Sequence, residues 1–354
     1  MTRPSKLEPP IEHSLWSREL IDWFDRNQRD LPWRRAPDPY RVWLSEIMLQ
    51  QTQVKTMLPY FERFISAYPS VADLADADET EVLDLWAGLG YYRRARNLHR
   101  TAQIVARDFD GKFPDRLEDL MQLPGIGRYS ASAILSIARG QPYPVLDGNV
   151  RRVLSRYLAV EGALSDGPFW AFLEEAVAVP AVAVRISDFN QGLMELGAIV
   201  CTPRNPICPD CPIRDSCVAR RKGLESELPA ARTRRKPIEE THTVVVITRR
   251  GRYLMHCNDR GPFLKGLWEF PRLVGRFESN RALARGLMEE FGLCARVEGP
   301  ITRIRHQITF RKLTFIAVGA VLHEDPPDPR WEWVAPQERG RPMSAYVRKV
   351  LAAG

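Results

Sequence analysis

The first 200 residues of the chain show apolar and polar positions that alternate with the period of an α-helix. Apolar residues recur at helical spacing near 14–28, 40–67, 79–108, 116–139, 147–159 and 185–200, and strand-like alternation is scarce there. Beyond residue 240, THTVVVIT, RYLMHC, ITRIRHQI and KLTFIAVGAVL are β-branched runs, and they flank the helical stretch SNRALARGLMEEFG. These patterns predict a mainly α N-terminal domain followed by an α+β C-terminal domain.

A polar, basic segment separates the two patterns. It reads KGLESELPAARTRRKPIEE, over residues 222–240, and has the composition of a linker. We therefore expect domains over residues 1–221 and 241–354, joined by a linker at 222–240.

One predicted helix carries an unusual polar face. In WLSEIMLQQTQV, residues 43–54, the apolar positions form one face, and Glu46, Gln50 and Gln53 share the other at i, i+4 and i+7. A solvent-exposed stripe is the ordinary interpretation of such a face. The three amides of the stretch, Gln50, Gln51 and Gln53, stand beside one acid without Lys or Arg to pair with it, and this also fits a functional surface.

Charge and hydropathy narrow the class of protein. The formal charge of +7 and a pI near 9.2, with arginine as the main basic residue, favour an anionic partner such as nucleic acid. The sequence lacks an apolar run of the roughly 20 residues that cross a membrane, and MTRPSKLEPP lacks the apolar core of a signal peptide. We expect a soluble, cytoplasmic protein with no membrane partner.

Four of the six cysteines form a compact set, Cys201, Cys208, Cys211 and Cys217, with the spacing C-x6-C-x2-C-x5-C. In a reducing compartment such a set predicts a metal site rather than disulfides. Four thiolates suit an iron–sulfur cluster or tetrahedral zinc. The spacing leaves both open, because a typical zinc site has two C-x2-C hooks and this loop has one.

Two further motifs resemble anion-binding turns. In LPGIGRYSASAILSIARG, Gly125 and Gly127 open a helix whose free N–H groups can face a phosphate, although such a turn can also merely connect two helices. In YPVLDGNVRRVLSRY, Asp147 precedes a helix that contains Arg151. Asp147 suits a helix N-cap, and it also suits a carboxylate that faces a sugar with developing positive charge.

Five motifs then occur in one order: SEIMLQQTQV, WAGLGYYRRARNLH, LPGIGRYSASAILS, LDGNVRRVLSR and the four-cysteine loop at 201–217. Together they resemble the helix-hairpin-helix DNA glycosylases with an iron–sulfur loop, and most closely the adenine-specific family. Residues 241–354 resemble Nudix folds more weakly. The resemblance implies one 4Fe-4S cluster on the four cysteines. It also implies a monomer that acts in the bacterial nucleoid on double-stranded DNA with an adenine:8-oxoguanine or adenine:guanine mispair.

The resemblance also assigns roles to individual residues. Glu46 stands where the family has the acid that protonates a flipped-out adenine, and Asp147 where it has the carboxylate that stabilises the sugar cation. Tyr129 and Asn149 match residues that support this pair. The positions that match DNA-contacting residues are Gln50, Gln51, Tyr91, Arg94, Gly125, Gly127 and Arg151.

Tyr129 separates this chain from bifunctional relatives, in which a lysine at that position attacks the sugar. The resemblance therefore implies a monofunctional enzyme that excises adenine in base excision repair. Two alternatives stay open: a thymine or uracil mismatch glycosylase of the same fold, and a non-catalytic iron–sulfur protein that binds DNA.

The C-terminal domain departs from its family pattern twice. The segment RGLMEE has Gly286 where a catalytic Nudix box has a glutamate, so we expect no pyrophosphate hydrolysis. In related enzymes this domain senses 8-oxoguanine through a loop that here contains Ile308, Thr309 and Phe310. Thr309 supplies the hydroxyl at the expected position, and we expect it to contact the lesion.

Overall fold

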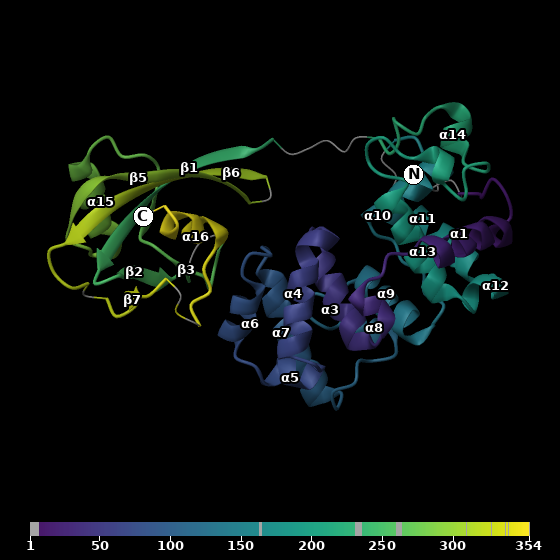
Figure 1. Ribbon diagram of the computed structural model, residues 1–354, viewed down its shortest axis with the longest axis horizontal. Helices are drawn as coiled ribbons and strands as arrows, with labels where there is room; N and C mark the ends of the chain where they lie inside the picture. Colours follow the sequence, from purple (N-terminus) through teal and green to yellow (C-terminus); the bar gives the residue numbers. More distant parts are fainter. Residues whose placement is uncertain are drawn as a thin grey trace, which may run out of the picture. The chain divides into compact units, whose positions relative to one another are not determined.

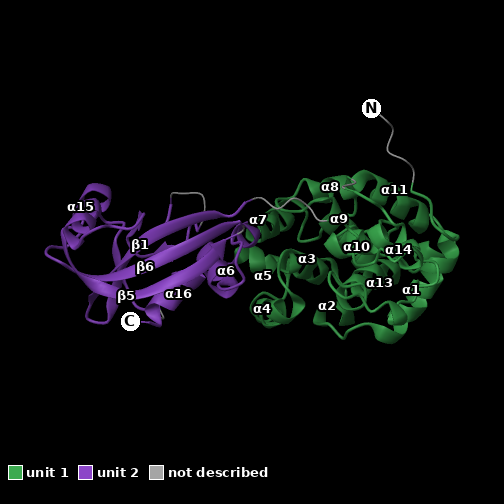
Figure 2. Ribbon diagram, turned by 90° about the horizontal axis from the view of Figure 1, so that it is seen from above, with its two compact units in different colours: residues 1–76, 97–233 green, residues 77–96, 234–354 purple. Residues whose placement is uncertain are grey.

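The computed structural model describes residues 7–162, 165–230, 236–259, 264–308, 310–326, 328–336, 338 and 340–353. The chain divides into two compact units (Figure 2). Unit 1 comprises residues 1–76 and 97–233, and unit 2 comprises residues 77–96 and 234–354. Unit 2 thus includes a short segment that lies far from the rest of it in the sequence.

Unit 1 is helical (Figure 1). Its helix α7 (Arg93–Asp108) begins in unit 2, because residues 93–96 belong to that unit. Its helices are α1 (His13–Asn27), α2 (Pro32–Arg35), α3 (Pro39–Leu49), α4 (Val54–Ala67), α5 (Val71–Asp76), α7 (Arg93–Asp108), α8 (Leu117–Met121), α9 (Arg128–Arg139), α10 (Gly148–Tyr157), α11 (Asp166–Val177), α12 (Pro180–Ala183), α13 (Ile186–Ile199) and α14 (Val218–Lys222), with a 3₁₀ turn η1 at Cys208–Asp210. Among the helices of the described residues, none has both the length and the apolar character of a membrane span.

Helix α13 lies at the centre of unit 1, and two glycines allow close packing against it. A Cβ on Gly192 would lie 3.3 Å from Phe24 of α1, and one on Gly197 would lie 2.7 Å from Asn149 of α10. Helix α13 therefore packs closely against both neighbours, which places the first turn of α10 directly over it.

Three of the predicted helical segments are interrupted. The segment 40–67 breaks between α3 and α4, where Gln51 has φ 59° and the Thr52 N–H donates to the Leu49 carbonyl at 3.1 Å. The segments 79–108 and 116–139 break at turns that contain Gly90, φ 74°, and Gly125, φ 80°. Left-handed residues end a helix, and periodicity alone does not reveal where they fall. The predicted segments do not include helices α2, α5, α11, α12 and α14.

Within the described residues, unit 2 contains a mixed sheet of seven strands. Five of them form the path β3-β2-β1-β6-β5, and β4 pairs with β1 and β7 with β2. Its elements are α6 (Glu79–Trp86), β1 (Ile238–Arg249), β2 (Arg252–Cys257), β3 (Trp268–Glu269), β4 (Arg272–Val274), α15 (Asn280–Phe291), β5 (Ala295–Ile308), β6 (Arg311–Leu322), β7 (Glu332–Val334) and α16 (Ala345–Leu351). Strands β1 and β6 are parallel, and the other pairs are antiparallel.

The two faces of this sheet have separate cores. Val244 and Val246 of β1 pack with Val347 of α16, whereas Val245 and Ile247 pack with residues of α15. Successive side chains of a strand point to opposite faces, so a continuous run of β-branched residues suits a strand that is covered on both sides. The sequence prediction of an α+β C-terminal domain is confirmed.

Candidate active site

The carboxyl group of Glu46 is enclosed by unit 1. Helix α3 begins after Asp38, whose side chain accepts a hydrogen bond from the Arg41 N–H at 2.9 Å, and it ends at Leu49. Glu46, in its last two turns, is only 5% exposed. The polar face predicted for this segment is therefore wrong in part: Gln50 and Gln53 lie beyond the helix end, because the chain turns at Gln51.

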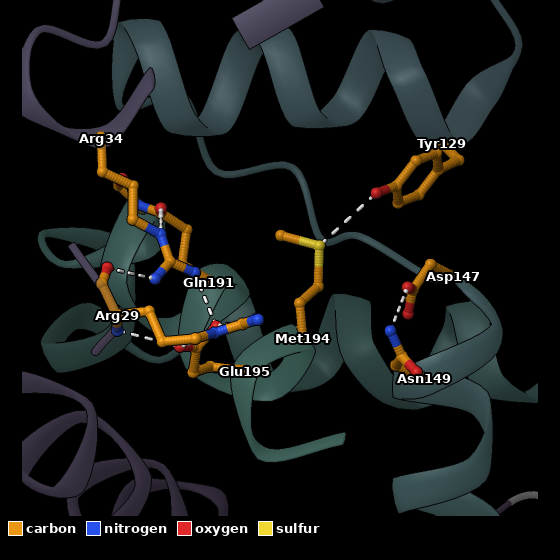
Figure 3. Close-up of polar contacts among 9 residues, drawn as sticks. Arg29, Arg34, Tyr129, Asp147, Asn149, Gln191, Met194 and Glu195 are labelled. Carbon is orange, nitrogen blue, oxygen red and sulfur yellow. Dashed lines mark hydrogen bonds and ion pairs between the residues drawn. The ribbon is translucent and has the colours of Figure 1, made fainter. Parts of the chain in front are cut away.

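Glu46 meets Tyr129, which stands in the first turn of α9. The Tyr129 hydroxyl donates to Glu46 Oε2. It also lies 3.5 Å from the Met194 Sδ of α13 (Figure 3). Burial raises the pKa of Glu46 to about 7; the Tyr129 hydrogen bond opposes this rise, and the charge of Asp147 adds to it. Near neutral pH the carboxyl group can therefore hold a proton and donate it.

Asp147 is both a helix cap and a site carboxylate. Its Oδ1 accepts from the Val150 N–H at 2.7 Å, and its Oδ2 accepts from Asn149 Nδ2 at 3.1 Å (Figure 3). Burial raises the pKa of Asp147, while the bonds from Val150 and Asn149 lower it. Arg152 donates to Asn149 Oδ1 at 2.9 Å, so the amide is fixed with its NH₂ toward the carboxylate.

These side chains line one cleft of about 1310 Å³ in unit 1. Its wall includes Glu46, Tyr129, Asp147 and Asn149, from α3, α9 and the start of α10. Glycosidases use two carboxyl groups in one cleft, one as a proton donor and one as an ionised carboxylate.

Comparison with known proteins bears on both units. Residues 44–175 match the HhH-GPD superfamily of base excision DNA repair proteins, and residues 242–353 match the NUDIX domain. The adenine DNA glycosylase of Homo sapiens is 35% identical, in an alignment that covers 90% of this chain and 70% of that protein. That of Buchnera aphidicola subsp. Schizaphis graminum is 38% identical and covers 73% of this chain and 74% of its own length.

This chain belongs to the adenine DNA glycosylase family. Solved structures agree on the fold of the helical part. A thermostable thymine-DNA glycosylase matches with a TM-score of 0.54 at 29% identity, over 59% of this chain and 97% of its own. A trapped endonuclease III–DNA covalent intermediate matches with a TM-score of 0.51 at 21% identity, over 60% and 99%. The predicted helix-hairpin-helix glycosylase fold and Nudix-like domain are confirmed, and the chain is a DNA glycosylase.

A second charged group of this glycosylase was missed by the sequence analysis. Glu195 of α13 is 1% exposed and accepts hydrogen bonds from Arg29 and from Arg34 Nη2, the latter at 2.9 Å (Figure 3). Burial alone would raise the pKa of Glu195, but these bonds outweigh it and lower the pKa to about 2. Arg34 also donates to Gln191 Oε1 at 3.0 Å. No local feature set Glu195 apart, because α13 carries a second acid, Asp188, in its first turn.

Three of the predicted DNA-contacting residues line the same cleft. Gln50 and Gln51 stand at its edge, in the turn between α3 and α4. Arg151 also lines it, and its guanidinium pairs with Asp166 of α11 and lies over the Phe169 ring, 5.3 Å from its centroid.

The two predicted hairpin glycines differ in backbone conformation and in their surroundings. Gly125 has φ 80°, and a Cβ there would lie 3.0 Å from the Asn97 side chain. Gly127 is the N-cap of α9 and has φ −100°, a conformation that any residue adopts, and nothing lies within 4 Å of a Cβ there. Thr101 Oγ1 donates to the Pro124 carbonyl at 2.9 Å and fixes the turn.

Tyr91 and Arg94 belong to unit 2. Tyr91 is 39% exposed and has φ 51°, in the turn between α6 and α7. Arg94 lies over the Tyr91 ring, 5.5 Å from its centroid, and burial lowers the pKa of its guanidinium to about 10. Arg94 thus contributes to the shape of the turn that presents Tyr91.

The cysteine loop folds around a small cavity, of about 30 Å³, which all four predicted cysteines line. Arg156, 2% exposed, donates to Cys201 Sγ at 3.3 Å and to the Thr202 carbonyl at 2.7 Å. Within the described residues, no three His, Cys, Asp or Glu side chains converge as the ligands of a single metal ion. The thiol donor set, the shared cavity and a buried cation fit an anionic multinuclear cluster.

The C-terminal expectations have different outcomes. Gly286 lies in α15, where a Cβ would stand 3.2 Å from both Leu273 and Phe277, so the position has little room for a catalytic glutamate. Thr309 lies outside the described residues. Phe310, next to it, accepts a hydrogen bond from the Ile238 N–H at 3.0 Å, which ties the start of β6 to β1.

Proposed function

We propose that this glycosylase removes adenine paired with 8-oxoguanine, or with guanine, and leaves an abasic site without cutting the strand. The observation that carries the proposal is the buried carboxyl group of Glu46, with its raised pKa, beside Asp147 in one cleft. The relatives' name, adenine DNA glycosylase, supports the choice of base. The adenine has to leave the base stack to reach the cleft, because the glycosidic bond is inaccessible within the duplex.

Glu46 acts as the general acid. In its protonated form it donates to a ring nitrogen of adenine, which weakens the bond from the base to the sugar. Tyr129 orients the carboxyl group through its hydrogen bond to Oε2. Gln50 and Gln51 occupy the space that the adenine leaves in the duplex.

Asp147 stabilises the positive charge that develops on the sugar as the bond breaks. The Val150 and Asn149 N–H groups that point at its oxygens favour its ionised form and hold it in place. As the protonated adenine leaves, the Asp147 carboxylate bonds to the sugar carbon that carried it. Water then cleaves this covalent intermediate and frees Asp147, as in a retaining glycosidase. Tyr129 has no amine, so the sugar is not captured as an imine.

The four cysteines would hold one 4Fe-4S cluster, which would contribute structure rather than chemistry to base release. Arg156 of α10 ties the start of this loop to the helix through its bonds to Cys201 Sγ and the Thr202 carbonyl. Arginines of this loop, such as Arg214, contact DNA phosphates, so binding weakens with salt.

The C-terminal domain reads the base opposite the adenine. Its resemblance to Nudix folds without the catalytic glutamate supports recognition rather than hydrolysis. Thr309 is the residue proposed to bond 8-oxoguanine, and Thr309→Val should cost about 0.5 to 1.5 kcal/mol of discrimination. An unchanged ratio of single-turnover rates on the two mispairs would exclude Thr309.

A thymine or uracil mismatch activity is the second candidate, because a thymine-DNA glycosylase shares 29% identity with the helical part. Single-turnover base release from adenine:8-oxoguanine, adenine:guanine, thymine:guanine and uracil:guanine duplexes separates the two. We expect release from the first two only and faster from the first. Duplex binding without release of any base would instead indicate a non-catalytic DNA-binding protein.

A further inference from the structure

The turn that presents Tyr91 is built from two side chains of its own segment. Trp86 Nε1 donates to the Gly90 carbonyl at 3.0 Å, and Arg94 donates to the Leu89 and Gly90 carbonyls at 3.4 and 3.3 Å. Arg94 also lies over the Trp86 ring, 5.2 Å from its centroid. These contacts define the Tyr91 turn, residues 87–92, but all come from within the segment.

Its flanks are held by the distant C-terminal part of unit 2. Before the turn, Asp84 Oδ2 accepts a hydrogen bond from the Gly340 N–H at 2.6 Å. At its end, the Tyr92 hydroxyl donates to the Met343 carbonyl at 3.3 Å. The two bonds span 256 and 251 positions of the sequence. Gly340 has φ 74°, a conformation that few L side chains adopt, so the turn that aims its N–H at Asp84 favours glycine.

A third contact follows one turn into α7. Arg96 Nη2 donates to the Lys265 carbonyl at 2.7 Å, and Arg96 Nε pairs with Glu79 at 3.2 Å. A Cβ on Gly266 would lie 2.0 Å from Arg96 Nη2, so the guanidinium rests directly on the backbone there.

The groups that hold the segment form one surface. The Trp268 N–H donates to the Pro342 carbonyl at 2.8 Å, and Trp268 also forms a β-bridge with Met343. The Arg341 guanidinium lies over the Trp268 ring, 4.3 Å from its centroid. Residues 264–268 and 340–343, which we call the rim loops, are therefore bonded to each other and present Lys265, Gly340 and Met343 together.

We propose that the rim loops hold the Tyr91 turn in place, with Asp84, Tyr92 and Arg96 as positioning residues. The C-terminal domain then has a second task besides contact with the lesion: it sets the conformation of an aromatic that the helical segment offers to DNA. The consequence for DNA rests on the proposed function, in which Tyr91 contacts the duplex. The mechanical part of the proposal, that the rim loops hold the Tyr91 turn, does not rest on the proposed function.

The mechanical part is tested by hydrogen exchange of the amides of residues 87–92 in the full-length protein. Asp84→Ala and Tyr92→Phe should each speed exchange there about two- to tenfold, the range expected for one lost hydrogen bond. Asp84→Asn keeps an acceptor oxygen and should restore most of the protection. Glu81→Gln on α6 and Arg100→Gln on α7, both exposed, are the matched controls. Unchanged exchange in both Asp84→Ala and Tyr92→Phe overturns the inference whatever the enzyme's substrate.

The functional part is tested by duplex binding in a Glu46→Gln background, which keeps the substrate intact. Tyr92→Phe should weaken affinity for the adenine:8-oxoguanine duplex about two- to tenfold, and should add little when Tyr91 is already replaced by Ser. A purely structural role would give independent losses that multiply, and that result overturns the functional part. If wild-type protein released no adenine, the proposed function would fail while the exchange result stood.

Discussion

The hydroxyl of Tyr129 donates its hydrogen bond to the buried carboxyl group of Glu46, across 83 positions of sequence. A phenol that is itself buried stays protonated, because burial raises its pKa well above the ordinary value. Tyr129 thus serves as a permanent donor that restrains how far burial can raise the pKa of Glu46. The proton affinity of the proposed acid is therefore set by a residue on another helix.

The rate of adenine release should depend on pH through Glu46. The acid must be protonated, and its pKa is about 7, so single-turnover rates should level off below about pH 6 and fall up to tenfold per unit well above pH 7. Tyr129→Phe removes the bond that lowers this pKa, so the falling limb should move to higher pH. Tyr60→Phe on α4 is the control. If the rate falls over the same pH range in the wild type and in both variants, the titration belongs to another group.

Glu46→Gln should abolish release while duplex binding persists, because the amide fits the same space and supplies no acidic proton. Positioned acid catalysis is worth about 10²- to 10⁴-fold in rate. Glu62→Gln, on an exposed position of α4, should leave the rate unchanged. Retention of more than a tenth of the wild-type rate by Glu46→Gln would reject Glu46 as the acid.

Glu46→Gln should be more stable than the wild type at high pH. The pKa of Glu46 is raised on folding, so the folded state binds the proton more tightly, and ionisation destabilises it as pH rises from about 4.5 through 7. Above pH 7 the gain from Glu46→Gln can reach roughly 3 kcal/mol, whereas at pH 4 it should vanish. Thermal unfolding of both proteins from pH 4 to pH 8 measures this difference in stability. A difference that does not change with pH contradicts the raised pKa of Glu46.

Two variants can separate the helix-capping role of Asp147 from its proposed catalytic role. Asparagine caps helices about as well as aspartate, so Asp147→Asn should cost little stability while it loses most activity, since a neutral amide stabilises a sugar cation poorly. Asp147→Ala should lose activity and also about 1 kcal/mol of stability. Denaturant unfolding and single-turnover release are measured together. Full activity in Asp147→Asn would leave Asp147 as a cap alone.

Cys208→Ser should remove both visible absorbance and soluble protein, because the cluster holds its loop together. Cys257→Ser, an exposed cysteine outside the loop, should change neither. Metal analysis of anaerobically purified protein should find iron. Zinc in its place would overturn the cluster assignment.

Borohydride should trap little wild-type protein on product DNA, because Tyr129 cannot form an imine with the sugar. Tyr129→Lys should gain trapping and some strand cleavage, since it places an amine where the phenol now meets Glu46. Efficient trapping of the wild type would show that another amine attacks the sugar.

Local patterns in the sequence already determined much of this protein. Helical periodicity placed most of unit 1, and the β-branched runs placed β1, β2, β5 and β6 but not the short strands β3, β4 and β7. Both patterns depend on neighbours a few residues apart. The four cysteines, Asp147 before its helix and Gly125 in its turn were recognisable for the same reason. Glu46 stood out as the single acid of its apolar segment, whereas Glu195 shares its helix with Asp188 and did not.

Tertiary structure alone decided which of these features meet. Nothing local indicates that Tyr129 reaches Glu46, that two arginines satisfy Glu195, or that Asp84 bonds Gly340. The helix break at Gln51 was equally hidden, because a left-handed residue other than glycine has no strong local signature. Such contacts depend on how whole helices and loops pack against each other. Burial, which follows from packing, then sets the proton affinity of Glu46, and no spacing in the sequence encodes that value.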